Sequence, residues 1–351
     1  MVRRFHPLRV VCVEKLTADA AAVTFEVPAD LRDEFCFLPG QHVVVRCPQA
    51  GDDKRRTYSL CAPPPTLRIG VKRIPGGVFS GYVLDHLRPG EVVEVMPPTG
   101  RFVASSDPGI RRRGAICAGS GITPVLPIME STLASDPDSR FTLIYGNRSA
   151  ATVMFLDEIA DLKDRYPDRL DVVHVFSREQ RESDLLTGRL DRNKLAELFD
   201  RLVPAGDIDE WFVCGPVGVI DAAKAELASR GVSPERIRSE LFHLDLPASP
   251  AVSPADSADG VATVTVRLSG RTTRLQVPFD TDILHAVLPL RADVPYGCTN
   301  GMCGTCRARV VEGRVEMRHC YALDEGQLAA GFVVTCQALP RTATVSVDYD
   351  A

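Results

Sequence analysis

Four cysteines in the last quarter of the sequence have the spacing of an iron–sulfur ligand set. Cys298, Cys303 and Cys306 follow the pattern C-x4-C-x2-C, and Cys336 completes the set further along the chain. This order matches plant-type [2Fe–2S] proteins, in which four thiolates hold two irons. We therefore predict a [2Fe–2S] cluster bound by these four cysteines, with a structural zinc site or unrelated thiols as the alternatives.

Small residues surround these cysteines. Gly297, Gly301 and Gly304 lie beside or between them. A loop that wraps a cluster needs positive φ angles and a close backbone approach, so that its amides can point at sulfur. Cys320 has no place in the pattern, and we interpret it as a free thiol, with ligand exchange as a remote alternative.

A short motif upstream, RTYS, combines a cation, an aromatic ring and hydroxyl groups. Alternate residues of a strand share a face, so Arg56 and Tyr58 are expected to project together, with Ser59 opposite or at the strand end. An arginine suits a diphosphate, and a tyrosine ring suits stacking on a flavin. Alone, the motif is weak, because such tetrapeptides also occur in strands by chance.

A glycine pair follows the next strand. Gly76 and Gly77 come after the strand that ends near Lys72, and Ser80 lies where a helical segment begins. The amides at the start of a helix can bind phosphate. The alternative is a glycine-rich turn with Ser80 as a helix N-cap.

Three further segments follow apolar strands. The turn GSGITP contains Gly119 and Gly121 and opens a helix, but it lacks the third glycine of a general dinucleotide fingerprint. Cys214 ends another strand at the carboxyl edge where open α/β sheets bind ligands, although it could equally be a small buried residue. Ser177 and Arg178 would suit a 2′-phosphate and so favour NADPH over NADH, with a capped turn and a surface arginine as the alternative.

These residues lie in three kinds of segment. The first hundred residues are typical of short strands separated by Pro/Gly turns, which predicts an antiparallel β-barrel. From about residue 110, apolar runs alternate with helical stretches, which predicts an α/β domain with a parallel sheet. The last 91 residues predict an α+β, β-grasp-like domain that begins with a hairpin. We therefore expect a multidomain chain: a barrel at 1–106, an α/β domain at 107–246, a linker rich in Ala, Pro and Ser at 247–260 and a ferredoxin-like domain at 261–351.

Composition excludes some classes of function. A net charge of −5 over 351 residues argues against a nucleic-acid partner. No apolar stretch reaches the ~18 residues of a membrane span, and no signal-peptide core is present, so we expect a cytoplasmic protein without a membrane partner. The eleven cysteines are then expected to be reduced. Five of them are interpreted as small buried hydrophobes without chemistry: Cys12, Cys36, Cys47, Cys61 and Cys117.

In this order, the motifs and segments resemble the ferredoxin-reductase-like oxygenase reductases over nearly the whole chain. The resemblance implies that Arg56 contacts the FAD diphosphate, Tyr58 the isoalloxazine ring and Ser59 the region near its N5 atom. The full set of implied flavin contacts is Arg56, Thr57, Tyr58, Ser59, Lys72, Gly76, Gly77, Val78 and Ser80.

The resemblance also makes GSGITP the turn that binds the nicotinamide nucleotide, and the absent third glycine is normal for this family. The segment CGP, together with Gly218, would form the second wall of the nucleotide site, with Cys214 near the nicotinamide. Glu240 and Phe242, in SELF, match an acidic and aromatic pair whose ring can cover the flavin. Ser59, Cys214 and Glu240 are the expected catalytic residues, and the implied nucleotide contacts are Gly119, Gly121, Thr123, Ser177, Arg178, Cys214 and Gly215.

Within the family, YALDEGQLAAGFVVTCQALP and the closing VSVDYDA are most similar to the reductases of phenylacetyl-CoA epoxidases. The reductases of 3-ketosteroid 9α-hydroxylases are similar in layout. The implied activity is transfer of electrons from NADPH, or alternatively NADH, through FAD and the [2Fe–2S] cluster to a terminal di-iron oxygenase. A ferredoxin module acting only as a carrier and a free-standing NAD(P)H:acceptor reductase are the alternatives.

Overall fold

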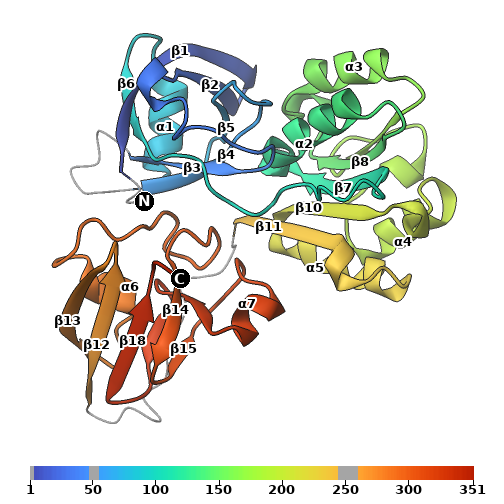
Figure 1. Ribbon diagram of the computed structural model, residues 1–351. Helices are drawn as coiled ribbons and strands as arrows, with labels where there is room; N and C mark the ends of the chain where they lie inside the picture. The colour runs from blue at the N-terminus through green and yellow to red at the C-terminus, as the bar shows by residue number, and fades with distance from the viewer. Residues whose placement is uncertain (1–3, 47–54, 244–259) are drawn as a thin grey trace. The chain divides into compact units, whose positions relative to one another are not determined.

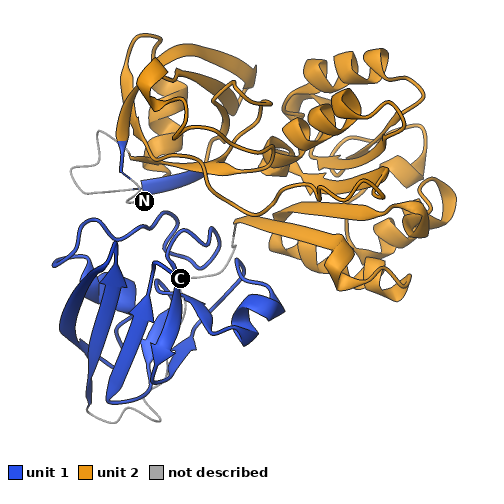
Figure 2. Ribbon diagram, viewed as in Figure 1, with its two compact units in different colours: residues 1–5, 55–57, 246–351 blue, residues 6–54, 58–245 orange. Residues whose placement is uncertain are grey.

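A computed structural model describes residues 4–46, 55–243 and 260–351 of the chain. Apart from Gly260, the predicted linker lies outside these described residues, as does Cys47. The chain divides into two compact units, which Figure 2 names unit 2 (residues 6–54 and 58–245) and unit 1 (residues 1–5, 55–57 and 246–351). The boundaries of the four segments expected from the sequence stay predictions.

A six-stranded sheet with the strand order β4-β3-β6-β1-β2-β5 forms the first part of the fold (Figure 1). An isolated antiparallel bridge between Leu60 and Ile69 joins the end of β4 to β5, so the sheet closes on itself as a barrel. Inward-facing apolar residues such as Val23 and Val93 fill it, together with Phe79 from α1. The elements are β1 (His6–Thr17), β2 (Ala20–Glu26), η1 (Ala29–Leu31), β3 (His42–Arg46), β4 (Arg55–Ser59), β5 (Arg68–Lys72), α1 (Val78–Asp85) and β6 (Val92–Val95).

The second part of unit 2 is a five-stranded sheet with the order β11-β10-β7-β8-β9, in which every neighbouring pair is parallel. Helices α2 and α3 cover one face and α4 and α5 the other (Figure 1). The strands are β7 (Arg112–Ala118), β8 (Arg140–Asn147), β9 (Leu170–Phe176), β10 (Glu210–Pro216) and β11 (Ile237–His243). The helices are η2 (Gly119–Gly121), α2 (Ile122–Ser135), η3 (Ala150–Thr152), α3 (Leu156–Arg165), η4 (Asp184–Leu186), α4 (Arg192–Arg201), η5 (Ala205–Asp207), α5 (Val217–Ser229) and η6 (Pro234–Arg236).

Parallel strands bring their carboxyl ends to one edge of the sheet, which is where ligands bind in open α/β folds. Two of the predicted nucleotide segments, the turn after β7 and the CGP segment at the end of β10, therefore lie at this same edge. The helix after the turn begins at Ile122, so Pro124 is its third residue. A proline is tolerated there because the first turn of a helix has no intrahelical acceptor for its amides.

Unit 1 holds a five-stranded sheet, β13-β12-β18-β14-β16, and the small pair β15-β17. Strands β12 and β13 form the expected hairpin, and β18 pairs in parallel with β12. Val264, Ile283 and Val345 are among its fully buried residues. The elements are β12 (Val261–Leu268), β13 (Arg271–Pro278), α6 (Ile283–Val287), β14 (Arg307–Glu312), β15 (Val315–Met317), α7 (Glu325–Ala329), β16 (Phe332–Val334), β17 (Ala338–Pro340) and β18 (Thr344–Asp348).

The fold class expected from the sequence, a barrel, a parallel α/β sheet and a ferredoxin-like α+β part, is confirmed. The interpretation of the scattered cysteines is partly wrong. Cys61 and Cys117 are buried, but Cys12 and Cys36 are exposed. Leu8 and Val10 of β1 are buried, so strict alternation would bury Cys12 as well. A register shift between Val10 and Cys12 breaks the alternation and leaves Cys12 on the outside of the barrel.

The barrel and the parallel sheet are joined by a cluster around Arg68 of β5. Its guanidinium donates to both carboxylate oxygens of Glu158 on α3, at 2.9 and 3.0 Å, and to Glu14 at 2.6 Å. It also lies 5.3 Å from the ring centroid of Phe155. A bidentate, charge-assisted pair of this kind fixes the angle between two elements as well as adding energy.

Replacing Arg68 with methionine should lower the free energy of unfolding of the protein by about 2 kcal/mol, because hydrogen bonds to charged groups are lost while the aliphatic stem is retained. The urea midpoint of circular dichroism would measure the change. Arg73→Met is the matched control, because Arg73 pairs with Asp85 on the exposed surface and should not shift the midpoint measurably. Equal shifts for both variants would contradict the assigned role of Arg68.

Candidate functional site

The strand β4 carries the RTYS motif. Tyr58 is half-buried, and its ring centroid lies 5.3 Å from that of Phe79 on α1. Ser59 is buried, at 3% exposure. Arg56 is exposed, and the buried hydroxyl oxygen of Thr57 has no hydrogen-bond partner among the described residues. A bound flavin nucleotide could stack on the aromatic ring, pair its phosphates with the exposed cation and give the hydroxyl a hydrogen-bond partner.

The three predicted catalytic residues are brought together by three different strands. Ser59 donates a hydrogen bond of 3.1 Å to Glu240 on β11, and Cys214 of β10 is the register partner of Glu240. Burial, followed by the charge of Glu240, raises the pKa of the Cys214 thiol well above its usual range. The thiol is therefore neutral at physiological pH. It can pack against neighbouring groups and form weak hydrogen bonds, but it cannot act as a nucleophilic thiolate.

A fourth residue of this group, His42, is not singled out by any sequence motif. It is buried at 1% exposure, and its Nδ1 atom lies 3.5 Å from a carboxylate oxygen of Glu240. Neither of its ring nitrogens has a hydrogen-bond partner among the described residues. A lone histidine in a strand carries no sequence signal, because only the tertiary fold brings β3 next to β11.

The glycine turn after β5 ends in the N-terminus of α1. Gly76 has φ +71°, a conformation that favours glycine, and the helix begins at Val78 with Gly77 as its N-cap. Ser80 is therefore not the N-cap, as the alternative interpretation of the sequence had it, but the third helical residue. Its hydroxyl accepts from the Ile74 amide at 3.1 Å and donates to the Gly77 carbonyl at 3.3 Å, so it braces the turn.

This arrangement suits an anion. The first amides of α1 have no acceptor within the helix, and the positive end of the helix dipole faces the same way. Val78 supplies the first of these amides. The predicted diphosphate contact at Val78 therefore fits the local backbone. The Gly77 amide already donates to the Ile74 carbonyl at 2.8 Å, and the Ser80 hydroxyl is likewise engaged within the protein.

Lys72 lies apart from this helix end and next to the nucleotide turn. Its Nζ atom is 4.0 Å from the position that a Cβ atom of Gly119 would occupy, and 3.8 Å from a carboxylate oxygen of Asp19. Burial lowers its pKa, partly offset by Asp19, and the charge of Arg148 lowers it further. Lys72 and Arg148 thus bring two cations near the carboxyl edge of the parallel sheet, and Arg148 was not anticipated from the sequence.

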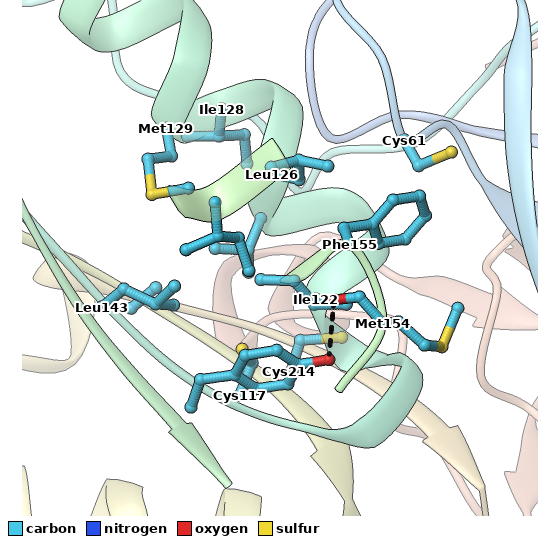
Figure 3. Close-up of a cluster of buried hydrophobic side chains, with 14 of the residues drawn as sticks. Cys61, Cys117, Ile122, Leu126, Ile128, Met129, Leu143, Met154, Phe155 and Cys214 are labelled. Carbon is cyan, nitrogen blue, oxygen red and sulfur yellow. Dashed lines mark hydrogen bonds between the residues drawn. The ribbon is translucent and has the colours of Figure 1, made fainter. Parts of the chain in front are cut away.

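The nucleotide turn itself is a 3-10 turn pressed against the end of β10. Gly119 has φ +55°, and a Cβ atom on Gly121 would lie 2.3 Å from the Cys214 carbonyl oxygen. Gly215 has φ +149° and packs against Ala118 in the same way. Figure 3 shows Cys117 and Cys214 side by side below Ile122, the residue that follows the turn. Close backbone approach therefore requires the glycine at 121, whereas positive φ angles favour glycine at 119 and 215.

Two more residues predicted to bind the nucleotide, Ser177 and Arg178, extend the pairing of β8 and β9 beyond the ends of these strands. The Ser177 amide donates to the Asn147 carbonyl at 2.9 Å, and the Arg178 amide donates to the Arg148 carbonyl at 2.8 Å. The Arg178 side chain is exposed at the carboxyl edge of the sheet. Phe242 is half-buried and packs against the core of the parallel sheet.

In unit 1, the four predicted cluster ligands are arranged as two pairs. The proximity of Cys303 raises the pKa of the Cys298 thiol, and the proximity of Cys336 raises that of Cys306. Among the described residues, no three His, Cys, Asp or Glu side chains gather as they would around a single ion. Two pairs of thiols are the donor set that two irons require, so these residues fit a [2Fe–2S] cluster.

The backbone of this loop is shaped around the Cys298 sulfur. The amides of Asn300 and Cys303 donate to it at 3.5 and 3.3 Å. Gly301 and Gly304 have the positive φ angles expected from the sequence, but Gly297 does not. The positive φ of Thr299, +57°, is unusual for a β-branched residue.

Three residues that the sequence did not indicate support the loop. The Gln337 side chain donates to the Thr299 carbonyl at 2.9 Å, and the Thr335 hydroxyl lies 3.0 Å from the Cys306 carbonyl and 2.7 Å from the Tyr349 hydroxyl. Such outer contacts orient metal ligands. Cys320 is a free, half-buried thiol packed against the core of unit 1, and burial raises its pKa.

Together, the fold and these two sites define a flavin-, nicotinamide- and iron–sulfur-dependent oxidoreductase. Family models match along the chain: an oxidoreductase FAD-binding domain at residues 7–103, an oxidoreductase NAD-binding domain at 115–225 and a 2Fe-2S iron-sulfur cluster binding domain at 266–341. When bound, FAD takes up an electron pair from a nicotinamide as hydride and the cluster carries electrons singly, while the protein positions and tunes both.

Two curated relatives match almost end to end. The chain is 42% identical to a subunit of the 1,2-phenylacetyl-CoA epoxidase of Escherichia coli (strain K12), over 99% of this chain and 98% of that one. It is 34% identical to the ferredoxin reductase component of 3-ketosteroid-9-alpha-monooxygenase of Rhodococcus rhodochrous, over 97% and 96%. The structure of phthalate dioxygenase reductase, 22% identical, shares the fold with a TM-score of 0.59 over 98% of both chains. The chain belongs to the family of ferredoxin-reductase-like oxygenase reductases.

The family and the type of activity predicted from the motifs are thereby confirmed. The chain is an NAD(P)H-dependent flavin and iron–sulfur oxidoreductase, an electron-transfer component of an oxygenase system. Within the described residues, no helix is long and apolar enough to cross a bilayer.

Proposed function

We propose that this chain supplies electrons from NADPH to a di-iron oxygenase of the phenylacetyl-CoA epoxidase type. The observation that carries the proposal is the 42% identity to the E. coli epoxidase subunit along 99% of the chain, against 34% for the steroid monooxygenase component. We further propose that it works in the cytoplasm, where its cysteines stay reduced.

The site residues of this function are part of the proposal. Ser59, Cys214 and Glu240 would border the place where flavin and nicotinamide meet. The Ser59–Glu240 hydrogen bond would hold the serine hydroxyl in one orientation, and the buried, neutral Cys214 would exclude water from beneath the nicotinamide. Cys298, Cys303, Cys306 and Cys336 would hold the cluster.

The test is a coupled assay with the purified holoenzyme. NADPH oxidation and product formation would be measured with the oxygenase components of a phenylacetyl-CoA epoxidase and, separately, with a 3-ketosteroid 9α-monooxygenase. We expect tightly coupled turnover with the epoxidase and little with the steroid enzyme. Coupled turnover only with the steroid oxygenase would overturn the choice of partner in favour of the second candidate, which the 34% identity supports.

The preference for NADPH would depend on Arg178. Arg178→Ala should lower the ratio of kcat/KM for NADPH to that for NADH about tenfold, because an exposed guanidinium at the sheet edge can pair with the 2′-phosphate, which NADH lacks. Steady-state kinetics with ferricyanide as acceptor would measure both values. Arg201→Ala, an exposed arginine at the end of α4, is the control and should leave the ratio unchanged. An unaltered ratio in Arg178→Ala would remove the basis for NADPH selectivity.

A further inference from the structure

The side chain of Tyr145 reaches from β8 to the turn at the end of β7. Tyr145 is fully buried, and its hydroxyl lies 2.9 Å from the carbonyl oxygen of Gly119. A second, longer contact of 3.5 Å to the Met154 carbonyl is dashed in Figure 3. Because burial raises the pKa of the Tyr145 phenol well above its usual range, the hydroxyl stays protonated and remains a donor.

The Gly119 and Ser120 carbonyls of the turn are both hydrogen-bonded within the protein. The Gly119 carbonyl accepts from Tyr145 and from the Ile122 amide, and the Ser120 carbonyl accepts from the same amide and, at 2.9 Å, from the Thr123 hydroxyl. In a trans peptide unit the carbonyl and the following N–H point in opposite directions. Because these donors hold both carbonyls, the amides of Ser120 and Gly121 point away from the start of α2.

The hydroxyl is not needed for packing. The Tyr145 ring belongs to the apolar core of the parallel sheet and lies 5.9 Å from the ring of His174. A phenylalanine would fill the same space without a polar atom to desolvate. Burying a hydroxyl is costly unless it is hydrogen-bonded, so its placement calls for a specific partner, and the Gly119 carbonyl is nearer to it than the Met154 carbonyl.

We propose that Tyr145 is a positioning residue for the nucleotide turn: its hydroxyl holds the Gly119 carbonyl, so that the Ser120 amide of the same peptide unit faces the diphosphate of the nicotinamide dinucleotide, beside the Gly121 amide. Two such amides at a strand–helix turn are suited to phosphate oxygens. The inference rests on the proposed function only in taking this turn as the nucleotide site. It predicts a defect in nucleotide binding with no change in the flavin.

The test is Tyr145→Phe in the full-length holoenzyme. KM and kcat for NADPH would be measured with ferricyanide, and the affinity for NADP+ from the perturbation of the flavin spectrum. We expect KM and the NADP+ dissociation constant to rise about tenfold, while kcat and flavin content stay within about twofold of the wild type. Tyr166→Phe, the same change at a half-buried tyrosine on the edge of the same core, should leave all four values unchanged.

Three results would overturn the proposal. The first is an unchanged KM and NADP+ affinity in Tyr145→Phe. The second is an equal defect in Tyr166→Phe. The third is loss of flavin or of folded protein in Tyr145→Phe, because the hydroxyl would then support the whole unit. A wild-type enzyme that does not oxidise NADPH or NADH at all would instead refute the proposed function, and that is measured before any variant is made.

Discussion

Replacing Cys336 with serine should abolish the [2Fe–2S] cluster and leave the flavin reaction intact. Cys336 is buried at 1% exposure beside Cys306, so a serine in its place leaves this pair with a single thiol. Iron in such clusters is held by thiolates, and a serine hydroxyl is far harder to deprotonate than a thiol. We expect iron and acid-labile sulfide to fall to background and the EPR signal of the reduced cluster to disappear. Reduction of an oxygenase partner should drop at least a hundredfold.

The same protein should still reduce ferricyanide with NADPH, because the predicted flavin and nucleotide residues lie mainly in unit 2 while the cluster ligands lie in unit 1. Cys320→Ser is the matched control. It removes a half-buried thiol of the same unit that belongs to neither thiol pair, so it should retain iron, sulfide and EPR signal. A Cys336→Ser protein with a full complement of iron, or a Cys320→Ser protein without it, would contradict the ligand assignment.

The cluster loop illustrates what could be predicted from the sequence. The spacing of the four cysteines indicated the ligand set because chemistry fixes both the number and the type of donors. The supporting contacts could not be predicted. Gln337 and Thr335 flank Cys336 in the sequence, but their acceptors, the carbonyls of Thr299 and Cys306, lie about 30 or more residues away along the chain. Such contacts depend on how the strands pack, and no local pattern records them.

The group around Glu240 shows the same limit. Cys214 and Glu240 face each other because of the parallel register of β10 and β11, and register follows from burial across the whole sheet. The resemblance to a family of reductases pointed to Ser59, Cys214 and Glu240, but it gave no reason to consider His42. Residues that act through tertiary proximity alone remain invisible until the fold is known.

The helix start at Val78 differs from what local sequence preference predicts. A serine near a helix start is a common N-cap, so local preference favours Ser80 in that position. The structure instead uses Gly77 as the cap and places Ser80 one turn in, where its hydroxyl closes the loop onto the Ile74 amide. The local turn at Gly76, where φ is +71°, therefore places the helix N-cap three residues before Ser80.

Gly121 lies where the turn after β7 meets the end of β10. Its φ and ψ of −61° and −10° are ordinary helical values, so backbone conformation does not require a glycine there. The available space does require a glycine, because an added Cβ atom would lie 2.3 Å from the Cys214 carbonyl oxygen, 2.6 Å from its carbonyl carbon and 3.0 Å from the Gly215 nitrogen. All three are backbone atoms, so no side-chain rotation can relieve the clash. The turn and the end of β10 would have to separate.

Gly121→Ala should therefore lower kcat/KM for NADPH about a hundredfold, which corresponds to about 2.7 kcal/mol and lies within the usual cost of overpacking. Flavin content should be unchanged, because the glycine turn and helix α1 lie on a different segment of unit 2. Steady-state kinetics with ferricyanide and flavin absorbance would measure both. Gly206→Ala is the control, since its Cβ atom would meet nothing within 4 Å. If Gly121→Ala kept the wild-type kcat/KM, the close approach of the two strand ends could not be what shapes the nucleotide site.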